Sequence, residues 1–196
     1  MRESFGSLYV GFPLAVIGVY IIIATMFRSY VQPFIILFTI PFGIIGGILA
    51  HLALRFNLSM MSIFGMVALA GVVVNDAIVL IERVNENVAN GMPFFESLEH
   101  AGKRRFRAIF LTSVSTIGGL APLIFETDLQ ARFLIPMALS IAGGVLFATV
   151  LTLVLIPSLM VILNDCRRVL YRFKYGLWPS RISVEPALTR NLQEEK

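Results

Sequence analysis

One acid lies within a stretch of the chain that is otherwise apolar enough to cross a lipid bilayer. Asp76 follows Asn75 in the run Val72-Val-Val-Asn-Asp-Ala-Ile-Val-Leu-Ile81. A charged carboxylate near the middle of a membrane costs several kcal/mol, so such residues are rare and usually face protein or water. Burial and a nearby cation act on its protonation in opposite directions, and a balance between them lets the carboxyl load and release protons near neutral pH. Asp76 is therefore the first candidate functional residue.

A second group of polar residues lies further along the chain. Arg105 and Thr112 are two helical turns apart, and Thr116 continues their stripe on the same face. A guanidinium at the membrane edge and hydroxyls deeper in would form a hydrogen-bonded path toward an acid on a neighbouring helix. The alternatives are charge anchoring for the arginine and bonds to helix carbonyls for the hydroxyls. For Asp76 the alternative is a structural ion pair or hydrogen bond, and the cost of burying an acid favours a functional role.

The residue patterns of soluble-enzyme chemistry are absent from the sequence. It contains no phosphate-binding glycine loop, no Ser–His–acid set and no metal-binding cluster of His, Cys and carboxylates. An intramembrane aspartyl protease would need a second carboxylate on a facing span, and the predicted spans contain only Asp76. We therefore expect no enzyme activity, no cofactor and no metal site.

Composition places the chain in a membrane. Of its 196 residues, 57% are hydrophobic and only 14% are charged, whereas a soluble domain carries about 25% charged residues. The net charge is +4. All Lys and Arg residues except Arg2, Arg55 and Arg132 fall on one predicted side of the membrane, which topology explains better than a nucleic-acid partner.

Five segments are long and apolar enough to span the bilayer as helices. They are residues 9–27, 33–53, 60–81, 108–125 and 133–163. Barrel strands would need short alternating segments, which the sequence lacks. The predicted fold is all-α, an integral membrane bundle of five transmembrane helices.

The remaining segments lie outside these spans. Residues 93–102 read as a short interfacial helix that begins at Pro93 and ends at Gly102. Residues 1–8 form an extracytoplasmic N-terminal stub, and residues 164–196 form a basic cytoplasmic tail that we expect to be mobile beyond Pro179. The side with most Lys and Arg is cytoplasmic, so the N-terminus lies outside and the C-terminus inside.

Small residues recur at four-residue spacing in two of the spans. They are Gly43 and Gly47 in the second span and Ser140, Gly144 and Ala148 in the fifth. In a bilayer such residues let helix backbones approach closely. Ordinary tight packing is favoured over a sliding interface.

Several motifs resemble those of one transporter family. They are Phe27-Arg-Ser-Tyr-Val-Gln-Pro33, Pro41-Phe-Gly-Ile-Ile-Gly-Gly47, Gly71-Val-Val-Val-Asn-Asp-Ala-Ile-Val-Leu-Ile-Glu82, Arg105-Phe-Arg-Ala-Ile-Phe-Leu-Thr-Ser113 and Gly119-Leu-Ala-Pro-Leu123. In order and spacing they resemble the C-terminal membrane half of the resistance–nodulation–division (RND) efflux pumps. Members are proton-driven multidrug exporters of the bacterial inner membrane. The resemblance covers roughly residues 4–163, and these spans would be the eighth to twelfth of twelve.

The resemblance implies a proton relay. Family members carry protons through two acids on the fourth helix, a lysine on the tenth, and an arginine and a threonine on the eleventh. Asn75 stands where the drug exporters commonly have the lysine, and Asp76 where they commonly have asparagine, whereas Arg105 and Thr112 match the arginine and the threonine. The lysine is thus absent and an acid lies next to its position. The Asn-Asp pair also resembles the acidic motif of the family's first half.

The resemblance also implies partners. Besides protons, an exported substrate and the lipid bilayer, these are the N-terminal half, two further copies in a homotrimer, and a periplasmic adaptor with an outer-membrane channel. The chain lacks the two acids of the fourth helix and the large substrate-binding loops, so we expect a fragment, truncated gene product or split subunit that cannot pump alone. Alternatives are a protein-export membrane subunit of the same superfamily and a non-transporting assembly or remnant protein.

Overall fold

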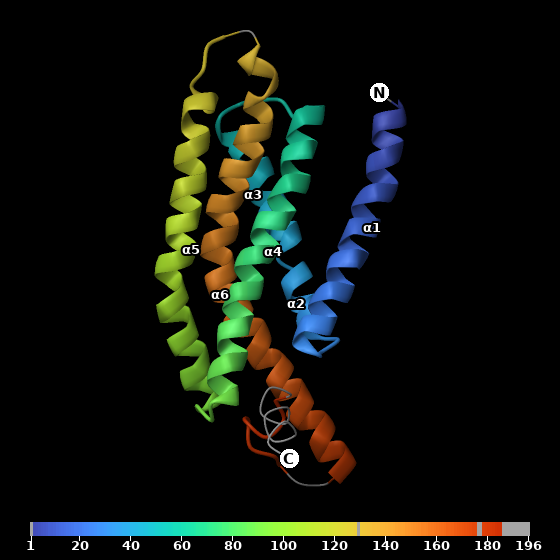
Figure 1. Cartoon of the computed structure of the whole chain (residues 1–196), viewed down its shortest axis with the longest axis vertical. Helices are drawn as coiled ribbons and strands as arrows, with labels where there is room; N and C mark the ends of the chain where they lie inside the picture. Colours follow the sequence, from blue (N-terminus) through green and yellow to red (C-terminus); the bar gives the residue numbers. More distant parts are fainter. Residues whose placement is uncertain (1, 129, 176–177, 186–196) are drawn as a thin grey trace.

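The computed structural model describes residues 2–128, 130–175 and 178–185, with side chains from residue 10 onward except those of residues 174 and 175. Its elements are the helices α1 (Arg2–Phe27), α2 (Gln32–Leu37), α3 (Ile40–Ala53), α4 (Met60–Ala89), α5 (Phe94–Ile124) and α6 (Ile135–Tyr175), with a 3-10 turn η1 (Ala131–Phe133) before α6 (Figure 1). Five helical segments are long and apolar enough to cross a membrane, with α2 and α3 together forming one of them. The predicted all-α bundle of five membrane helices is confirmed.

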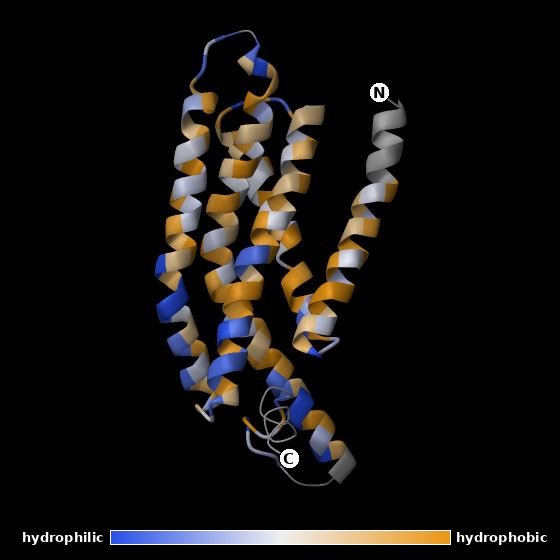
Figure 2. Ribbon diagram, viewed as in Figure 1, coloured by the Kyte–Doolittle hydropathy of each residue, from blue (hydrophilic) through white to orange (hydrophobic). Residues whose placement is uncertain are grey.

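Helix α6 is the centre of the bundle. It packs against α3, α4 and α5, while α1 stands apart and reaches the bundle mainly through α2 (Figure 1). The core lies between α4 and α6, where Leu80, Ile81 and Ile156 are fully buried. Apolar residues dominate the middle of the helices, and hydrophilic residues gather toward the lower end of α4, α5 and α6 (Figure 2). The lower end of the bundle in Figure 1 is called its basic end below, because most Lys and Arg residues lie there.

The small residues of α3 and α6 lie against each other. A side chain added at Gly144 would collide with the side chain of Leu69, and its Cβ would lie 2.9 Å from the carbonyl oxygen of Gly43. A Cβ at Gly47 would lie 3.1 Å from the carbonyl oxygen of Ser140. The backbones of α3 and α6 are therefore as close as small residues permit.

The second predicted span is broken into two helices. Residues 38–39 interrupt the helix between α2 and α3, and Pro41 occupies the first turn of α3. Proline has no N–H to donate to the carbonyl four residues earlier, and its ring crowds that carbonyl. The hydroxyl of Thr39 donates to the carbonyl oxygen of Ile36 at 2.5 Å and so satisfies one acceptor at the break.

The predicted stop at Gly102 is wrong. Helix α5 begins after Pro93, as expected, but continues without a break through Gly102 to Ile124. One continuous helix therefore replaces the short interfacial helix 93–102 and the span 108–125. Leu98 and Ala101 are buried on one side of Gly102 and Ile109 on the other, so packing against the bundle outweighs the weak helix propensity of a single glycine.

Three helices extend well beyond their predicted spans. Helix α1 begins at Arg2 rather than residue 9, so most of the predicted N-terminal stub is helical. Helix α4 runs to Ala89 rather than residue 81, and α6 runs to Tyr175 rather than residue 163. Hydropathy marks where a helix leaves the apolar layer, not where its backbone hydrogen bonds end. The prediction of a mobile tail beyond Pro179 is wrong for residues 180–185, which pack against α6. Residues 186–196 lie outside the described residues.

Candidate functional site

Asp76 lies near the middle of α4, at the border of its buried face. Ala77 and Leu80 are fully buried against the bundle, Asp76 is half-buried, and Asn75 is exposed. Since successive residues are about 100° apart around a helix, Asp76 is turned from the core toward the bundle surface, and Asn75 further still. The carboxyl is therefore placed to meet a group from outside the described bundle.

The Asp76 carboxylate has no hydrogen bond or ion pair with any residue in the described part of the chain. Acids within membrane helices normally pair with another residue or face a water-filled cavity. A structural ion pair within this chain, the alternative considered for Asp76, is thus not present among the described residues.

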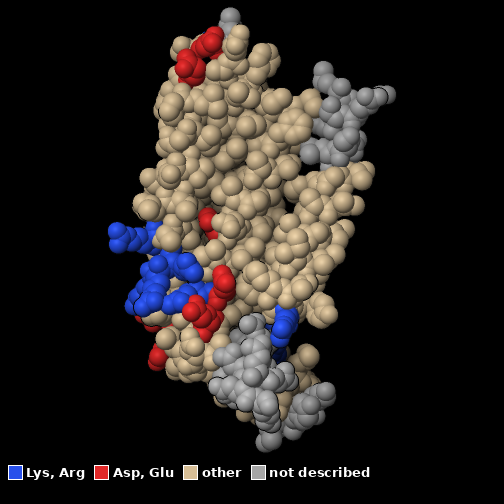
Figure 3. Space-filling view, viewed as in Figure 1, with Lys and Arg blue, Asp and Glu red and all other residues tan. Residues whose placement is uncertain are grey.

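Arg105 lies on α5, beside two further arginines. It lines a hollow of about 260 Å³ together with Arg83 of α4 and Arg104 of α5. Arg83 pairs with the exposed Glu86, whereas no hydrogen bond or ion pair joins Arg104 or Arg105 to another described residue. Most of the Lys and Arg visible in Figure 3 gather below the middle of the molecule, and a group of acids lies at the opposite end. Arg105 therefore carries an uncompensated charge toward the basic end of the bundle.

Thr112 is bonded within its own helix. Its hydroxyl donates to the carbonyl oxygen of Ile109 at 2.8 Å, and the hydroxyl of Thr116 donates to the carbonyl oxygen of Thr112 at 2.8 Å. Both bonds are the back-bonding that is common in membrane helices. No hydrogen bond or ion pair among the described residues joins Asp76 to Arg105 or Thr112. The structure places Asp76 and Asn75 on α4 and Arg105 and Thr112 on α5, two helices that pack directly against each other.

The buried hydroxyl contact between α5 and α6 is formed by a neighbour of Thr112. Ser113 is buried, its hydroxyl lies 2.5 Å from that of Thr149 on α6, and it also donates to the carbonyl oxygen of Ile109 at 2.9 Å. We did not single out Thr149 from the sequence. The sequence does show that Thr149 is a hydroxyl residue within the apolar run of α6. It cannot show that Ser113 is its partner, because tertiary packing decides which side chain it meets.

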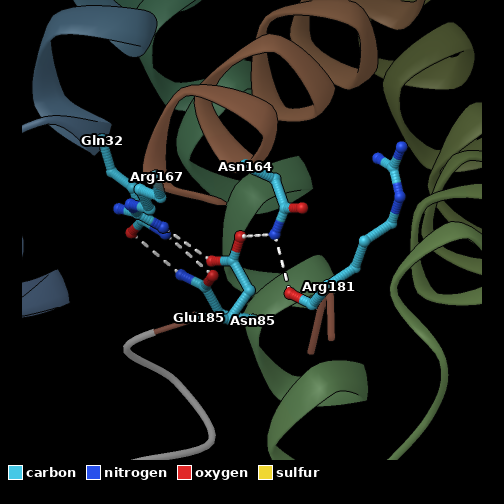
Figure 4. Close-up of polar contacts among 6 residues, drawn as sticks. All are labelled: Gln32, Asn85, Asn164, Arg167, Arg181 and Glu185. Atoms are coloured by element: carbon cyan, nitrogen blue, oxygen red, sulfur yellow. Dashed lines mark hydrogen bonds and ion pairs between the residues drawn. The ribbon is translucent and has the colours of Figure 1, made fainter. Parts of the chain in front are cut away.

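Two further buried polar contacts tie helices together. Ser62 and Ser59 form a capping box at the start of α4, and the Ser62 hydroxyl also lies 2.9 Å from Nε2 of His51 on α3. Nδ1 of His51 donates to the carbonyl oxygen of Gly47 at 2.9 Å, so both ring nitrogens are engaged by groups of the bundle. At the other end of the bundle, Gln32 and Asn85 exchange a reciprocal amide pair at 2.9 and 3.0 Å (Figure 4). Neither contact was expected from the sequence.

No three His, Cys, Asp or Glu side chains come close enough to hold a metal ion within residues 2–128, 130–175 and 178–185. The polar groups that the structure offers are thus a half-buried carboxylic acid on α4, an unpaired guanidinium and a back-bonded hydroxyl on α5. Ionisable residues within membrane helices commonly mark ion or proton pathways, so Asp76 is the leading candidate for such a role.

Comparison with known proteins supports a transporter. The family model described as "AcrB/AcrD/AcrF family", of the RND transporters, matches residues 1–164. The chain is 33% identical over 169 residues to the swarming motility protein SwrC of Bacillus subtilis, covering 86% of this chain and 16% of that protein. It is 30% identical over 155 residues to the multidrug resistance protein MdtC of Erwinia amylovora, covering 79% of this chain and 15% of that protein.

Solved structures agree with this assignment. Two crystal forms of a heavy metal efflux pump superpose with TM-scores of 0.76 and 0.71 at 27% and 26% identity, and each match covers 84% of this chain and 16% of the pump. The chain thus spans about a sixth of the length of the relatives that it matches. The family model, the relatives and the shared helix arrangement lead to one conclusion: this chain belongs to the AcrB/AcrD/AcrF family of RND transporters.

Proposed function

We propose that this chain forms the C-terminal membrane part of a proton-motive-force-driven exporter and that Asp76 takes up and releases the transported proton. The observation that carries the proposal is the Asp76 carboxyl itself, which lies half-buried at mid-helix and has no partner among the described residues. A carboxylate kept without a partner in an apolar helix is costly, and a change of protonation removes that cost for part of each transport cycle.

The other relay residues would act on α4 and α5. The guanidinium of Arg105 supplies a fixed positive charge on the neighbouring helix α5. The hydroxyl of Thr112 bonds to its own helix at present, and a rotation about its Cα–Cβ bond would free it to donate toward the acid. The side chain of Asn75 is exposed next to Asp76 and can orient a carboxyl or a water molecule. The proton relay thus consists of Asp76, Asn75, Arg105 and Thr112.

The relay needs groups that this bundle does not contribute. Asp76 lies at the border of the buried face of α4, Asn75 is exposed, and most apolar side chains of α1 are exposed as well. We therefore propose that further helices of the same pump cover these surfaces. By family resemblance the pump is a homotrimer in the bacterial inner membrane that works with an adaptor and an outer-membrane channel. The basic end of the bundle would lie in the cytoplasm and the N-terminus in the periplasm.

The exported substrate is not assigned. The relatives are called a swarming motility protein and a multidrug resistance protein, and the similar structures are those of a heavy metal efflux pump. These names do not agree on one transported substrate. The proposal therefore concerns how export is driven and not what is exported.

The decisive experiment replaces Asp76 in the complete pump. Asp76→Asn keeps the size and polarity of the side chain but cannot ionise, so we expect proton-driven export to be lost while the amount of folded protein stays unchanged. Glu86→Gln, which removes an exposed acid from the same helix, is the matched control and should export normally. Normal export by Asp76→Asn would refute the proposal.

A purely structural role has a different signature. If the chain were a non-transporting assembly or remnant protein, or a subunit of a protein-export complex, Asp76→Asn would change stability or assembly and leave drug or ion flux unaffected. Expression of these 196 residues alone, in a strain without homologous pumps, should produce no efflux. Efflux from that strain would show that the bundle needs no further helices.

A further inference from the structure

The chain folds back on itself after α6. Residues 178–185, called the strap below, lie against the last turns of α6 (Figure 4). Nδ2 of Asn164 donates to the carbonyl oxygen of Arg181 at 2.8 Å and to Oε1 of Glu185 at 2.7 Å, and Nη1 of Arg167 donates to Oε2 of Glu185 at 2.8 Å. Both carboxylate oxygens of Glu185 are thus held by side chains of α6.

These groups are removed from solvent. Glu185 is 3% exposed and Asn164 is fully buried. A buried carboxylate that accepts charge-assisted hydrogen bonds is held firmly, and removal of one partner leaves the other uncompensated. Glu185 is therefore the main attachment of the strap to α6.

A second set of contacts holds the start of the strap. The guanidinium groups of Arg168 and Arg172 lie over the ring of Trp178, 5.1 and 4.8 Å from its centroid. Nε of Arg168 also donates to the carbonyl oxygen of Pro179 at 3.1 Å. These contacts are more exposed than those of Glu185, so each contributes less.

The strap also reaches α5. The guanidinium of Arg181 lies 4.5 Å from the centroid of the Phe95 ring on α5 and pairs with Asp165 of α6 at 3.0 Å. Ile182 packs against the main apolar core. The strap therefore joins the end of α6 to the first turn of α5, at the basic end of the bundle.

We propose that the strap acts as a releasable latch that holds α6 and α5 together. The hydrogen bonds accepted by the Glu185 carboxylate keep this latch closed. The contact between Ser113 and Thr149 already joins the middle of the two helices, so the latch adds a second tie at their basic end. With the latch open, the first turns of α5 would lose this tie to the end of α6. This proposal stands independently of proton transport, because it rests on contacts that include none of the relay residues.

The contacts themselves indicate that the latch can open. In the closed latch, Oδ1 of Asn164 and Nη1 of Arg181 are buried without a hydrogen bond. Nη1 of Arg181 has only its ion pair with Asp165. A buried polar group without a hydrogen bond lowers the net stability of the arrangement that buries it. Apart from the chain connection to α6, the contacts that hold the strap among the described residues are non-covalent, so its closure is a balance that a single substitution can shift.

Trypsin cleavage at the bond between Arg181 and Ile182 tests the latch in the full chain, reconstituted in lipid nanodiscs and followed by mass spectrometry. In the wild type the bond should be cut slowly, because Arg181 is held by α5 and α6. Glu185→Gln replaces one acceptor oxygen by an amide group that donates, although the facing groups of Asn164 and Arg167 are donors as well. Cleavage should therefore be at least about tenfold faster than in the wild type. A tenfold change corresponds to about 1.4 kcal/mol of latch stability. Equal rates in the wild type and the variant would overturn the proposal.

Two controls separate latch opening from general damage. Glu86→Gln removes an acid from an exposed ion pair at the same end of the bundle and should leave the cleavage rate unchanged. Arg167→Ala combined with Glu185→Gln should be cut about as fast as Glu185→Gln alone, because the contact that Arg167→Ala removes is one of those that Glu185→Gln already disrupts. Additive effects of the two substitutions would show that Glu185 and Arg167 act separately. That result would contradict the proposal that their contact keeps the latch closed.

A distance measurement tests the tie between the helices. Cys166 is the single cysteine of the chain and is exposed on α6, so it accepts a spin label, and Glu96→Cys provides a second label on the first turn of α5. The distance distribution should be narrow with the latch closed and broader in Glu185→Gln. An unchanged distribution despite fast cleavage would show that the strap does not restrain α5, which would overturn its role as a tie.

Discussion

Asp76 and Glu185 are two acids within one small bundle, yet their surroundings are opposite. Glu185 is buried, and both of its oxygens accept hydrogen bonds from α6. Asp76 is half-buried in an apolar helix and has no such partner among the described residues. The hydrogen bonds of Glu185 are not local contacts, because its partners lie about 20 residues earlier in the chain. The contrast therefore arises from tertiary packing. The difference distinguishes an acid that is bound within this chain from one whose carboxyl has no partner among the described residues.

The arginines repeat the same contrast. Arg167 and Arg181 near the C-terminus are paired with acids, whereas Arg104 and Arg105 line a hollow without a hydrogen bond or ion pair to a described residue. Unpaired charges of opposite sign thus lie on α4 and α5, which pack against each other. Paired charges lie where the strap meets α6. The charges of the first region have no partner among the described residues, and those of the second are paired within the chain.

The largest expected effect comes from the unpaired acid. In the complete pump, Asp76→Asn should reduce export at least about 100-fold, because general acid–base groups commonly contribute about 10²–10⁴ to a rate. The same substitution should leave the folded bundle intact, since no contact of Asp76 within the described residues is lost. Transport assays in proteoliposomes, together with thermal unfolding in detergent, measure both effects. If Asp76→Asn fails to fold, Asp76 has a structural role like that of Glu185, and the two acids do not differ as described.

The paired acid should behave in the opposite way. Glu185→Ala leaves Arg167 and Asn164 without their shared acceptor, which we expect to cost about 2–3 kcal/mol at the end of α6. Hydrogen exchange of the Glu185 amide, which donates to the carbonyl oxygen of Ile182 at 3.2 Å, should accelerate accordingly. Asp76→Asn should leave this exchange unchanged. Slow exchange in Glu185→Ala would show that the strap is held by other contacts.

Two neighbouring hydroxyls on α5 extend the comparison. Ser113→Ala removes a buried contact to Thr149 and should destabilise the bundle by about 1 kcal/mol. Thr112→Ala removes only a bond within its own helix and should change stability by a few tenths of a kcal/mol, while export by the complete pump is lost. Chemical unfolding of the two variants gives the stability difference. The opposite order of stabilities would mean that the packing between α5 and α6 differs from that described here.

The smallest effect is expected at an exposed pair. Glu86→Gln removes the partner of Arg83 at the surface of α4, and such pairs contribute about 0–1 kcal/mol. Unfolding at low and high salt should give nearly equal values for the variant and the wild type. A loss of more than about 1 kcal/mol would indicate that Glu86 also helps to hold the arginine hollow.

Local sequence signals predicted the part of this structure that depends on composition. The five membrane spans follow from apolar runs, and Asp76 was found because an acid interrupts one of them. The helix ends at Ala89 and Tyr175 were missed, since backbone hydrogen bonds continue past the apolar run. The break before Ile40 was missed although Pro41 marks it, because hydropathy is unaffected by a lost N–H.

Contacts between distant residues could not be predicted in the same way. The pair of Ser113 with Thr149 and the attachment of Glu185 to Asn164 join positions 36 and 21 residues apart. Their side chains meet only because α6 packs along α5 and the chain then turns back. Among the residues of the proposed relay, types and spacing were visible in the sequence, but whether Asp76 bonds to Arg105 or Thr112 depends on how α4 and α5 pack.

Infrared difference spectroscopy of the complete pump tests the central claim most directly, because a protonated carboxyl has a C=O stretching band that an ionised carboxylate lacks. We predict one such band that appears and disappears when a proton gradient is imposed and that is absent in Asp76→Asn but present in Glu86→Gln. A band that persists in Asp76→Asn, or that does not respond to the gradient, would contradict the assignment of Asp76 as the proton carrier.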